Sequence, residues 1–261
     1  MRALSDGVSG QIPVYGVRTV VVTSTVEQYI KVLFTETEHS GEQLVSMKRV
    51  SEAMNVTPGT ATSMAKHLAS LELVEYQPRR GCRLTEDGKQ LAIRMVRRHR
   101  LIETFLEQIL GYDWSEVHAE AERLEHAVSD GFIARIDALL RYPDNDPHGD
   151  PIPAAGGELA AAHAVSLCEA PVGVRLRVVR VLDDSPTFLG LMKRYELLPG
   201  AFCRVIPNEE ASDTIRVRHE ADKPGEGREV SLSNDAAGRV LVVPAEIAVG
   251  KRSETARNAE I

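Results

Sequence analysis

The segment S-E-V-H-A-E-A-E-R-L-E-H-A-V-S-D (residues 115–130) carries carboxylates and imidazoles at helical spacing. Glu122, Glu125 and His126 occupy positions i, i+3 and i+4, so a helix through them would place all three side chains on one face. His118 precedes them by about one turn. Two carboxylates and an imidazole suit a borderline divalent cation. A solvated acidic helix face is the competing interpretation.

The size and composition of the chain indicate a globular protein of one or two domains. Its 261 residues are 43% hydrophobic and 26% charged, which is ordinary for such proteins. No apolar run approaches the roughly 20 residues that span a bilayer, and the N-terminus has no secretory signal pattern. Cys82, Cys168 and Cys203 are far apart, which favours reduced thiols. We expect a cytoplasmic protein without membrane contact.

The charge of the chain is unevenly distributed. The formal net charge is -7, yet residues 41–100 contain eleven lysines and arginines against six acidic residues. The rest of the chain contains twenty basic and thirty-two acidic residues. A basic module on an acidic body is typical of a protein with one nucleic-acid-binding face.

Within this basic module, the pattern predicts a helix-turn-helix followed by a wing. An amphipathic helix begins near Ser24 and ends near Gly41, and a short helix follows at residues 46–54. Thr57-Pro58 is a typical start of the next helix, with an N-cap and a proline at the first helical position. Two short β-like runs then flank Pro78-Arg79-Arg80-Gly81, as in a DNA-binding wing. A packing module without DNA contact is the competing interpretation.

Hydroxyl and basic side chains on this module are the candidate DNA contacts. Lysine and arginine would supply salt-dependent affinity for phosphates, and hydroxyls would contribute positioning and some base readout. The expected contact residues are Thr57, Thr60, Thr62, Ser63 and Lys66 in the second helix of the motif and Arg79 and Arg80 in the wing.

The remaining patterns predict a helical region, a linker and a small β domain. The apolar stripes of residues 85–110 and 132–142 are wider than a winged helix can cover, which predicts a homodimer interface. Residues 143–157 contain four prolines and three glycines, which indicates an extended linker. Five short strand patterns follow at 174–182, 202–206, 214–219, 229–232 and 240–243, with a helix at 189–198, as in a small SH3-like barrel.

The sequence therefore predicts a mainly α protein with a small β domain. Its parts are an N-terminal extension (1–22), a winged helix-turn-helix DNA-binding domain (23–88), a helical metal-binding and dimerisation domain (89–142), a linker (143–168), an SH3-like β-barrel (169–248) and a tail (249–261).

Three signatures occur in this order: R-R-H-R-L-I-E (97–103), V-H-A-E-A-E-R-L-E-H-A-V-S-D (117–130) and H-G-D-P-I-P (148–153). With them, residues 25–243 resemble the diphtheria toxin repressor family of iron- and manganese-dependent transcriptional regulators. The resemblance implies a metal-activated homodimer that represses metal-homeostasis genes by binding a palindromic double-stranded DNA operator. It implies no small-molecule substrate.

The resemblance also implies two metal sites. Its primary site corresponds to Gln28, Glu122, Glu125 and His126, and its ancillary site to His99, Glu103 and His118. Gln28 departs from the Met or Asp usual in the family, and a helix-surface glutamine is the alternative. Lys31 replaces an acidic ligand of one manganese-specific branch, which favours the two-site layout over a binuclear one. Asp183 and Asp184 are candidates for a ligand from the SH3-like domain.

The expected metal is Mn(II), with Fe(II) as the alternative. The iron-responding branch of the family carries cysteine at the position of Glu122, and a carboxylate is a harder ligand than a thiolate. The Irving–Williams order predicts that Fe(II), Co(II), Ni(II) and Zn(II) would also bind in vitro.

Two other functions fit parts of the pattern. A metallo-hydrolase could use the same Glu/His cluster around an activated water, but the sequence contains no H-E-x-x-H or G-x-S-x-G motif. A metal-independent regulator could bind a peptide through the SH3-like domain, and the thermal shift caused by Mn(II) would separate it from a metal sensor. We expect that the protein is not an enzyme.

Overall fold

The computed structural model describes residues 23–154, 164–207, 213–220 and 227–246. The expected N-terminal extension (1–22) and tail (249–261) lie outside these residues. The described chain forms two compact units, one comprising residues 23–98 with 125–127 and the other the remaining residues. In the part that is described, no helix is long and apolar enough to cross a membrane.

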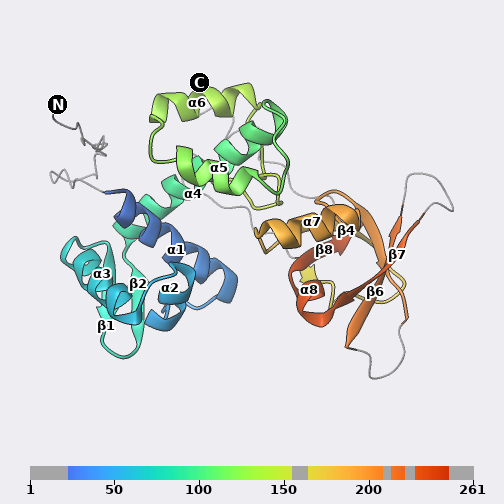
Figure 1. The fold of residues 1–261 in the computed structure, drawn as a ribbon, viewed down its shortest axis with the longest axis horizontal. Helices are drawn as coiled ribbons and strands as arrows, with labels where there is room; N and C mark the ends of the chain where they lie inside the picture. Colours follow the sequence, from blue (N-terminus) through green and yellow to red (C-terminus); the bar gives the residue numbers. More distant parts are fainter. Residues whose placement is uncertain (1–22, 155–163, 208–212, 221–226, 247–261) are drawn as a thin grey trace, which may run out of the picture. The chain divides into compact units, whose positions relative to one another are not determined.

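The first unit contains the predicted winged helix-turn-helix (Figure 1). Its elements are α1 (Ser24–Ser40), α2 (Met47–Ala53), α3 (Pro58–Ser70), β1 (Val74–Gln77), β2 (Gly81–Leu84) and the first part of α4 (Glu86–Gln108). Hydroxyl side chains cap the first three helices, because Thr23, Ser46 and Thr57 each accept a hydrogen bond from a backbone N–H of the first turn. Such caps satisfy donors that have no partner within the helix.

The wing is held to the helices by a close backbone contact. Its strands pair antiparallel from Val74↔Leu84 to Gln77↔Gly81, and Val45 exchanges two backbone hydrogen bonds of 2.9 Å with Cys82. Gly81 has φ +139°, and a Cβ at this position would lie 2.2 Å from the Val45 carbonyl oxygen. Only glycine fits here, because the backbones approach so closely.

The helical part of the second unit consists of the end of α4 with α5 (Val117–Leu124) and α6 (Asp130–Leu139). Leu101, Ile102 and Leu106 of α4 form its core with Val117 and Ala121 of α5. The prediction of one helix continuing through Glu125 and His126 was wrong, since α5 ends at Leu124.

Three tertiary contacts account for the early end of α5. The Glu125 carbonyl accepts a hydrogen bond from Arg98 Nη1 (3.2 Å). The side chains of Glu125 and His126 pair with residues of α1. Residues 125–127 accordingly belong to the first unit, and Ser129 caps the following helix α6.

Residues 143–154, the start of the expected linker, form an ordered turn in the second unit. The Asp146 carboxylate accepts hydrogen bonds from the backbone N–H groups of His148 (2.8 Å) and Asp150 (2.9 Å). Ile152 is buried in the helical core. At Gly149 (φ +87°) a Cβ would lie 1.9 Å from the Val179 carbonyl oxygen, so this position also requires glycine.

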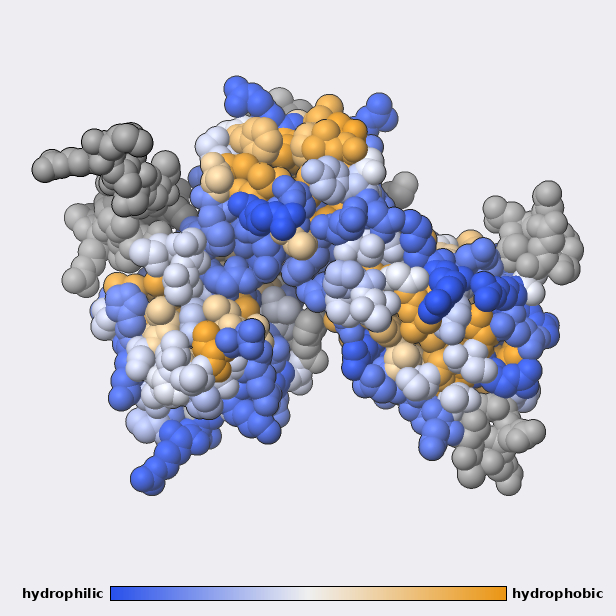
Figure 2. Space-filling model, in the orientation of Figure 1, coloured by the Kyte–Doolittle hydropathy of each residue, from blue (hydrophilic) through white to orange (hydrophobic). Residues whose placement is uncertain are grey.

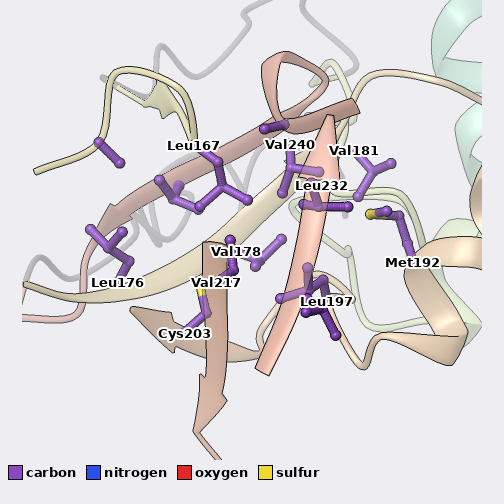
Figure 3. Packing of buried hydrophobic residues seen from close by; sticks show 14 of the residues in the cluster. Leu167, Leu176, Val178, Val181, Met192, Leu197, Cys203, Val217, Leu232 and Val240 are labelled. Atoms are coloured by element: carbon purple, nitrogen blue, oxygen red, sulfur yellow. The ribbon is translucent and has the colours of Figure 1, made fainter. Parts of the chain in front are cut away.

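The C-terminal region is a six-stranded antiparallel sheet in the order β3-β8-β4-β5-β6-β7. Its strands are β3 (Val165–Ser166), β4 (Arg175–Val181), β5 (Phe202–Val205), β6 (Thr214–Glu220), β7 (Glu229–Ser233) and β8 (Val240–Pro244), with helices α7 (Pro186–Arg194) and α8 (Asn234–Gly238). The alternating apolar residues of the strands point into one core, together with Met192 and Leu197 (Figure 3).

The expected closed barrel is an open sheet. Among the described residues its edge strands β3 and β7 do not pair with each other, and β3 has only two residues. In a closed barrel, paired edge strands would enclose the core. Here helix α7 covers part of the core instead, because Phe188, Leu189 and Met192 pack into it.

Candidate metal centres and DNA-binding surface

The turn after α5 brings a carboxylate and an imidazole against α1 in the first unit. His126 Nε2 lies 3.5 Å from Glu125 Oε1, and His126 Nδ1 lies 2.7 Å from Glu27 Oε2. Glu27 thus accepts a hydrogen bond from His126 Nδ1 and orients the imidazole ring. A histidine oriented in this way by a carboxylate is typical of metal ligands.

Lys31 completes this cluster from the next turn of α1. Its Nζ lies 2.8 Å from Glu125 Oε1, and Glu125 is fully buried whereas Lys31 is 8% exposed. Gln28 lies half-buried on the same helix. Glu122 belongs to α5 in the second unit, where its Oε1 lies 3.7 Å from His118 Nε2. The residues of the expected primary site are thus divided between the two units.

The three residues of the expected ancillary site lie together in the second unit. Glu103 Oε1 is 2.8 Å from His99 Nε2 and 3.0 Å from His118 Nδ1, and the two ring nitrogens are 3.1 Å apart. His99 and Glu103 are one turn apart on α4, and His118 comes from α5. Of the two aspartates expected to add a ligand, Asp184 approaches His118 Nε2 (Oδ2 at 3.3 Å), whereas Asp183 pairs with Arg239.

Histidines determine the charge of Glu103, which is 2% exposed. Burial alone would raise the pKa of its carboxyl, but the charge of His99 and hydrogen bonds from His118 and His99 hold this pKa well below the usual range. The carboxylate is therefore ionised at neutral pH and available as an anionic ligand.

Glu103 also belongs to a second triad, with Asp146 and His148. All three are buried, and one potential ligand atom of each lies within 4.8 Å of the others. His148 Nε2 lies 3.0 Å from the Trp114 carbonyl oxygen, an acceptor, so Nδ1 is the nitrogen that faces Glu103 Oε2 (3.9 Å). Burial, together with the charges of Asp150 and Glu103, raises the pKa of Asp146 well above its usual value.

The roles of four residues in these clusters were not expected from the sequence. Glu27 and Lys31 lie within the amphipathic pattern of α1. That pattern does not indicate that they pair with residues 125 and 126. Asp146 and His148 lie within the proline-rich signature, which was interpreted as a linker. The alternation D-P-H-G is a usable signal, since it places an acid and an imidazole two residues apart.

The candidate DNA contacts lie on the exposed surfaces of α3 and the wing. Thr60, Ser63, Lys66, Arg79 and Arg80 are exposed. Three of the hydroxyls also have local partners, because those of Thr57 and Thr60 lie 2.9 Å apart. The Thr57 hydroxyl caps α3 at the Thr60 N–H (3.2 Å), and Thr62 Oγ1 donates to the Pro58 carbonyl (2.8 Å).

An apolar patch lies on the helical part of the second unit, and Figure 2 shows apolar residues gathered over α6. We call it the helical patch. Its exposed members are Ile109, Leu110, Tyr112, Phe132 and Leu139. Clustered exposed apolar side chains are typical of protein–protein interfaces.

Three family models match successive parts of the chain. The family described as "Iron dependent repressor, N-terminal DNA binding domain" matches residues 21–82. The family "Iron dependent repressor, metal binding and dimerisation domain" matches residues 85–154, and the FeoA domain matches residues 165–244.

Individual relatives agree with these matches. The iron-dependent repressor IdeR of Mycobacterium tuberculosis is 33% identical over 165 residues, covering 60% of this chain and 71% of IdeR. The transcriptional regulator MntR of Bacillus subtilis is 35% identical over 126 residues, covering 48% of this chain and 87% of MntR. A solved manganese-dependent transcriptional repressor in complex with manganese is 39% identical, with a TM-score of 0.76, and the match covers 84% of this chain and 99% of that one. This chain therefore belongs to the iron-dependent repressor family of metal-dependent transcriptional repressors, with a DNA-binding domain, a metal-binding and dimerisation domain and a FeoA domain.

Proposed function

We propose that this protein is a Mn(II)-activated repressor that binds a palindromic operator as a homodimer. The observation that carries the proposal is the contact between α1 of the DNA-binding unit and Glu125 and His126. Because the buried Glu125 and the half-buried His126 meet α1 through Lys31 and Glu27, a change in their charge balance acts directly on the first helix of the DNA-binding unit. A metal that binds one arrangement of these groups more tightly than another shifts the protein towards that arrangement.

The proposed primary ligands are Gln28, Glu122, Glu125 and His126. Glu125 and His126 have the strongest support, since their ligand atoms are 3.5 Å apart and Glu27 orients the imidazole. Gln28 would contribute a neutral amide oxygen. The bound metal would add positive charge beside Glu125, whose counter-charge in the metal-free protein comes from Lys31.

The proposed ancillary ligands are His99, Glu103 and His118, with Asp184 at the accessible side of His118. Glu103 is central to the proposal, because it also faces Asp146 and His148. A cation bound to the ionised Glu103 carboxylate would therefore have two sets of further donors nearby. One set is His99 and His118, and the other is Asp146 and His148.

Mn(II) is the proposed metal and Fe(II) the second candidate. Carboxylates and imidazoles without thiolate favour the harder ion, and the most similar of the proteins reported above is a manganese-dependent repressor. The likeness to IdeR supports Fe(II). We infer that the clusters serve regulation without catalysis, since Glu103 and His148 are 2% and 3% exposed and offer a substrate little access.

The proposal is tested by metal-dependent DNA binding. Duplexes are selected from a random pool with Mn(II)-loaded protein, and the selected duplex is used in fluorescence anisotropy with chelator, Mn(II) or anaerobic Fe(II). We expect Mn(II) to tighten binding about 100-fold and Glu122→Ala to reduce this effect. Glu52→Ala, at an exposed acidic residue of α2, is the matched control.

Each alternative outcome has a distinct meaning. Equal DNA affinity with and without metal contradicts the proposal and favours a metal-independent regulator. An equal or stronger response to Fe(II) retains the mechanism and replaces the metal. Selection of duplexes without two-fold symmetry contradicts the palindromic operator.

A further inference from the structure

We propose that Lys31 is a tethered cation that competes with the metal for Glu125 and thereby sets the metal concentration at which the protein responds. The inference rests on the proposed primary site. It assigns Lys31 a role in setting affinity, without contact to the metal itself.

Lys31 and His126 both lie close to the same oxygen atom, Oε1 of Glu125. Glu125 Oε1 lies 2.8 Å from Lys31 Nζ and 3.5 Å from His126 Nε2. Glu27 precedes Lys31 by one turn of α1 and binds the other nitrogen of the imidazole, at 2.7 Å. One helix face therefore holds both the anion that orients the histidine and the cation that neutralises the carboxylate.

Because the Lys31–Glu125 pair is buried, the charge of the Lys31 ammonium group strongly affects Glu125. Glu125 is 0% exposed and Lys31 is 8% exposed, so little water screens the pair. A buried carboxylate without a counter-charge is strongly destabilising. In the metal-free protein Lys31 supplies that counter-charge, and the fold can bury Glu125 before any metal arrives.

The same charge opposes metal binding. A divalent cation held by Glu125 and His126 would lie close to the ammonium group, and two positive charges repel strongly where water is scarce. Metal binding therefore requires the Lys31–Glu125 contact to weaken or the ammonium to move. Either requirement lowers the affinity and raises the metal concentration needed for repression.

A purely structural role for Lys31 predicts the opposite result. If Lys31 only held Glu125 in a ligating position, its removal would weaken metal binding. If Lys31 competes with the metal, its removal strengthens metal binding while it destabilises the metal-free protein. The direction of the change in affinity thus separates the two roles.

The experiment compares the full-length metal-free protein with Lys31→Gln, using calorimetric titration with Mn(II) and thermal unfolding. We expect Lys31→Gln to lower the Kd for Mn(II) by about tenfold or more and to lower the Tm of the metal-free protein by about 5 °C. Lys48→Gln is the matched control, because it removes a lysine whose side chain is 82% exposed and paired with Glu52. Its Kd should stay within about twofold of the wild type.

A second measurement uses the wild-type protein, in case Lys31→Gln does not fold. The Lys31 side-chain ammonium resonance is followed by NMR during titration with diamagnetic Zn(II). We expect it to shift as Zn(II) saturates the protein. An unchanged resonance, or an unchanged or higher Kd of Lys31→Gln, overturns the inference and leaves the proposed metal site standing. Absence of metal binding in the wild type contradicts the proposed site itself.

Discussion

Among single residues, Glu27 should control how well His126 serves as a ligand of the proposed metal site. Its carboxylate lies 2.7 Å from Nδ1 and orients the ring. Because such partners typically change metal affinity 10–100-fold, we expect Glu27→Gln to weaken Mn(II) binding by about tenfold in a calorimetric titration. Glu52→Gln is the control, and an unchanged Kd of Glu27→Gln contradicts the role of Glu27.

The three cysteines should differ in reactivity because they differ in burial. Burial raises the pKa of Cys82 to about 12, and burial with the nearby charge of Glu220 does the same for Cys203. Compared with an ordinary value of 9, this lowers the thiolate fraction at pH 8 about a thousandfold.

Cys168 is exposed, although its pKa is also raised, first by partial burial and then by Glu169. We expect iodoacetamide at pH 8 to label Cys168 in the native protein. Cys82 and Cys203 should react only after denaturation, which peptide mass spectrometry would detect. Native labelling of either buried thiol contradicts this prediction.

Among the elements, α3 depends on its N-cap. The Thr57 hydroxyl accepts a hydrogen bond from the Thr60 N–H and lies 2.9 Å from the Thr60 hydroxyl. We expect Thr57→Ala to lower the free energy of unfolding by about 1 kcal/mol, measured by urea denaturation. Thr57→Ser retains the hydroxyl and should be nearly neutral, so equal losses in the two variants would assign the effect to the methyl group.

The elements could largely be predicted from the sequence because their periodicity is local. The strand predicted at 202–206 is β5 (Phe202–Val205), and the wing turn lies at Arg79 as expected. The end of α5 at Leu124 could not be predicted in this way. It depends on contacts of Glu125 and His126 with α1, about 100 residues away in the chain, and helical spacing carries no information about them.

The same distinction applies to the candidate sites. His99 and Glu103 could be paired from their i, i+4 spacing alone, and their atoms lie 2.8 Å apart. The proline-rich composition around Asp146 and His148 predicted a linker, although both are buried against Glu103. The proline-rich composition indicates that no helix forms there. It does not indicate that Asp146 and His148 are buried, because their burial depends on how the turn packs against the rest of the second unit.

At the scale of the whole molecule, each unit contains its own cluster of acidic residues and histidines. Glu125 and His126 meet α1 within the first unit, and the groups around Glu103 lie within the second. A family member built in this way can couple one cluster to the DNA-binding helices and use the other to stabilise the helical and sheet regions. The helical patch is the surface at which we expect a second copy of the chain to bind.

Dimerisation should depend on the helical patch. Phe132 and Leu139 of α6 are 43% and 57% exposed, so charges introduced there leave the monomer fold intact and oppose burial in an interface. We expect Phe132→Glu/Leu139→Glu to be monomeric in light scattering at about 10 μM, with unchanged helical circular dichroism.

Loss of the dimer should also weaken DNA binding. A single winged helix makes half of the phosphate and base contacts on a palindromic site, so the affinity of the double variant for the selected duplex should fall about 100-fold. Val172→Glu, at a 57% exposed apolar residue of the sheet region, is the control and should remain dimeric. A double variant that stays dimeric would place the interface elsewhere, and a monomer that binds DNA at full affinity would contradict recognition by two symmetric winged helices.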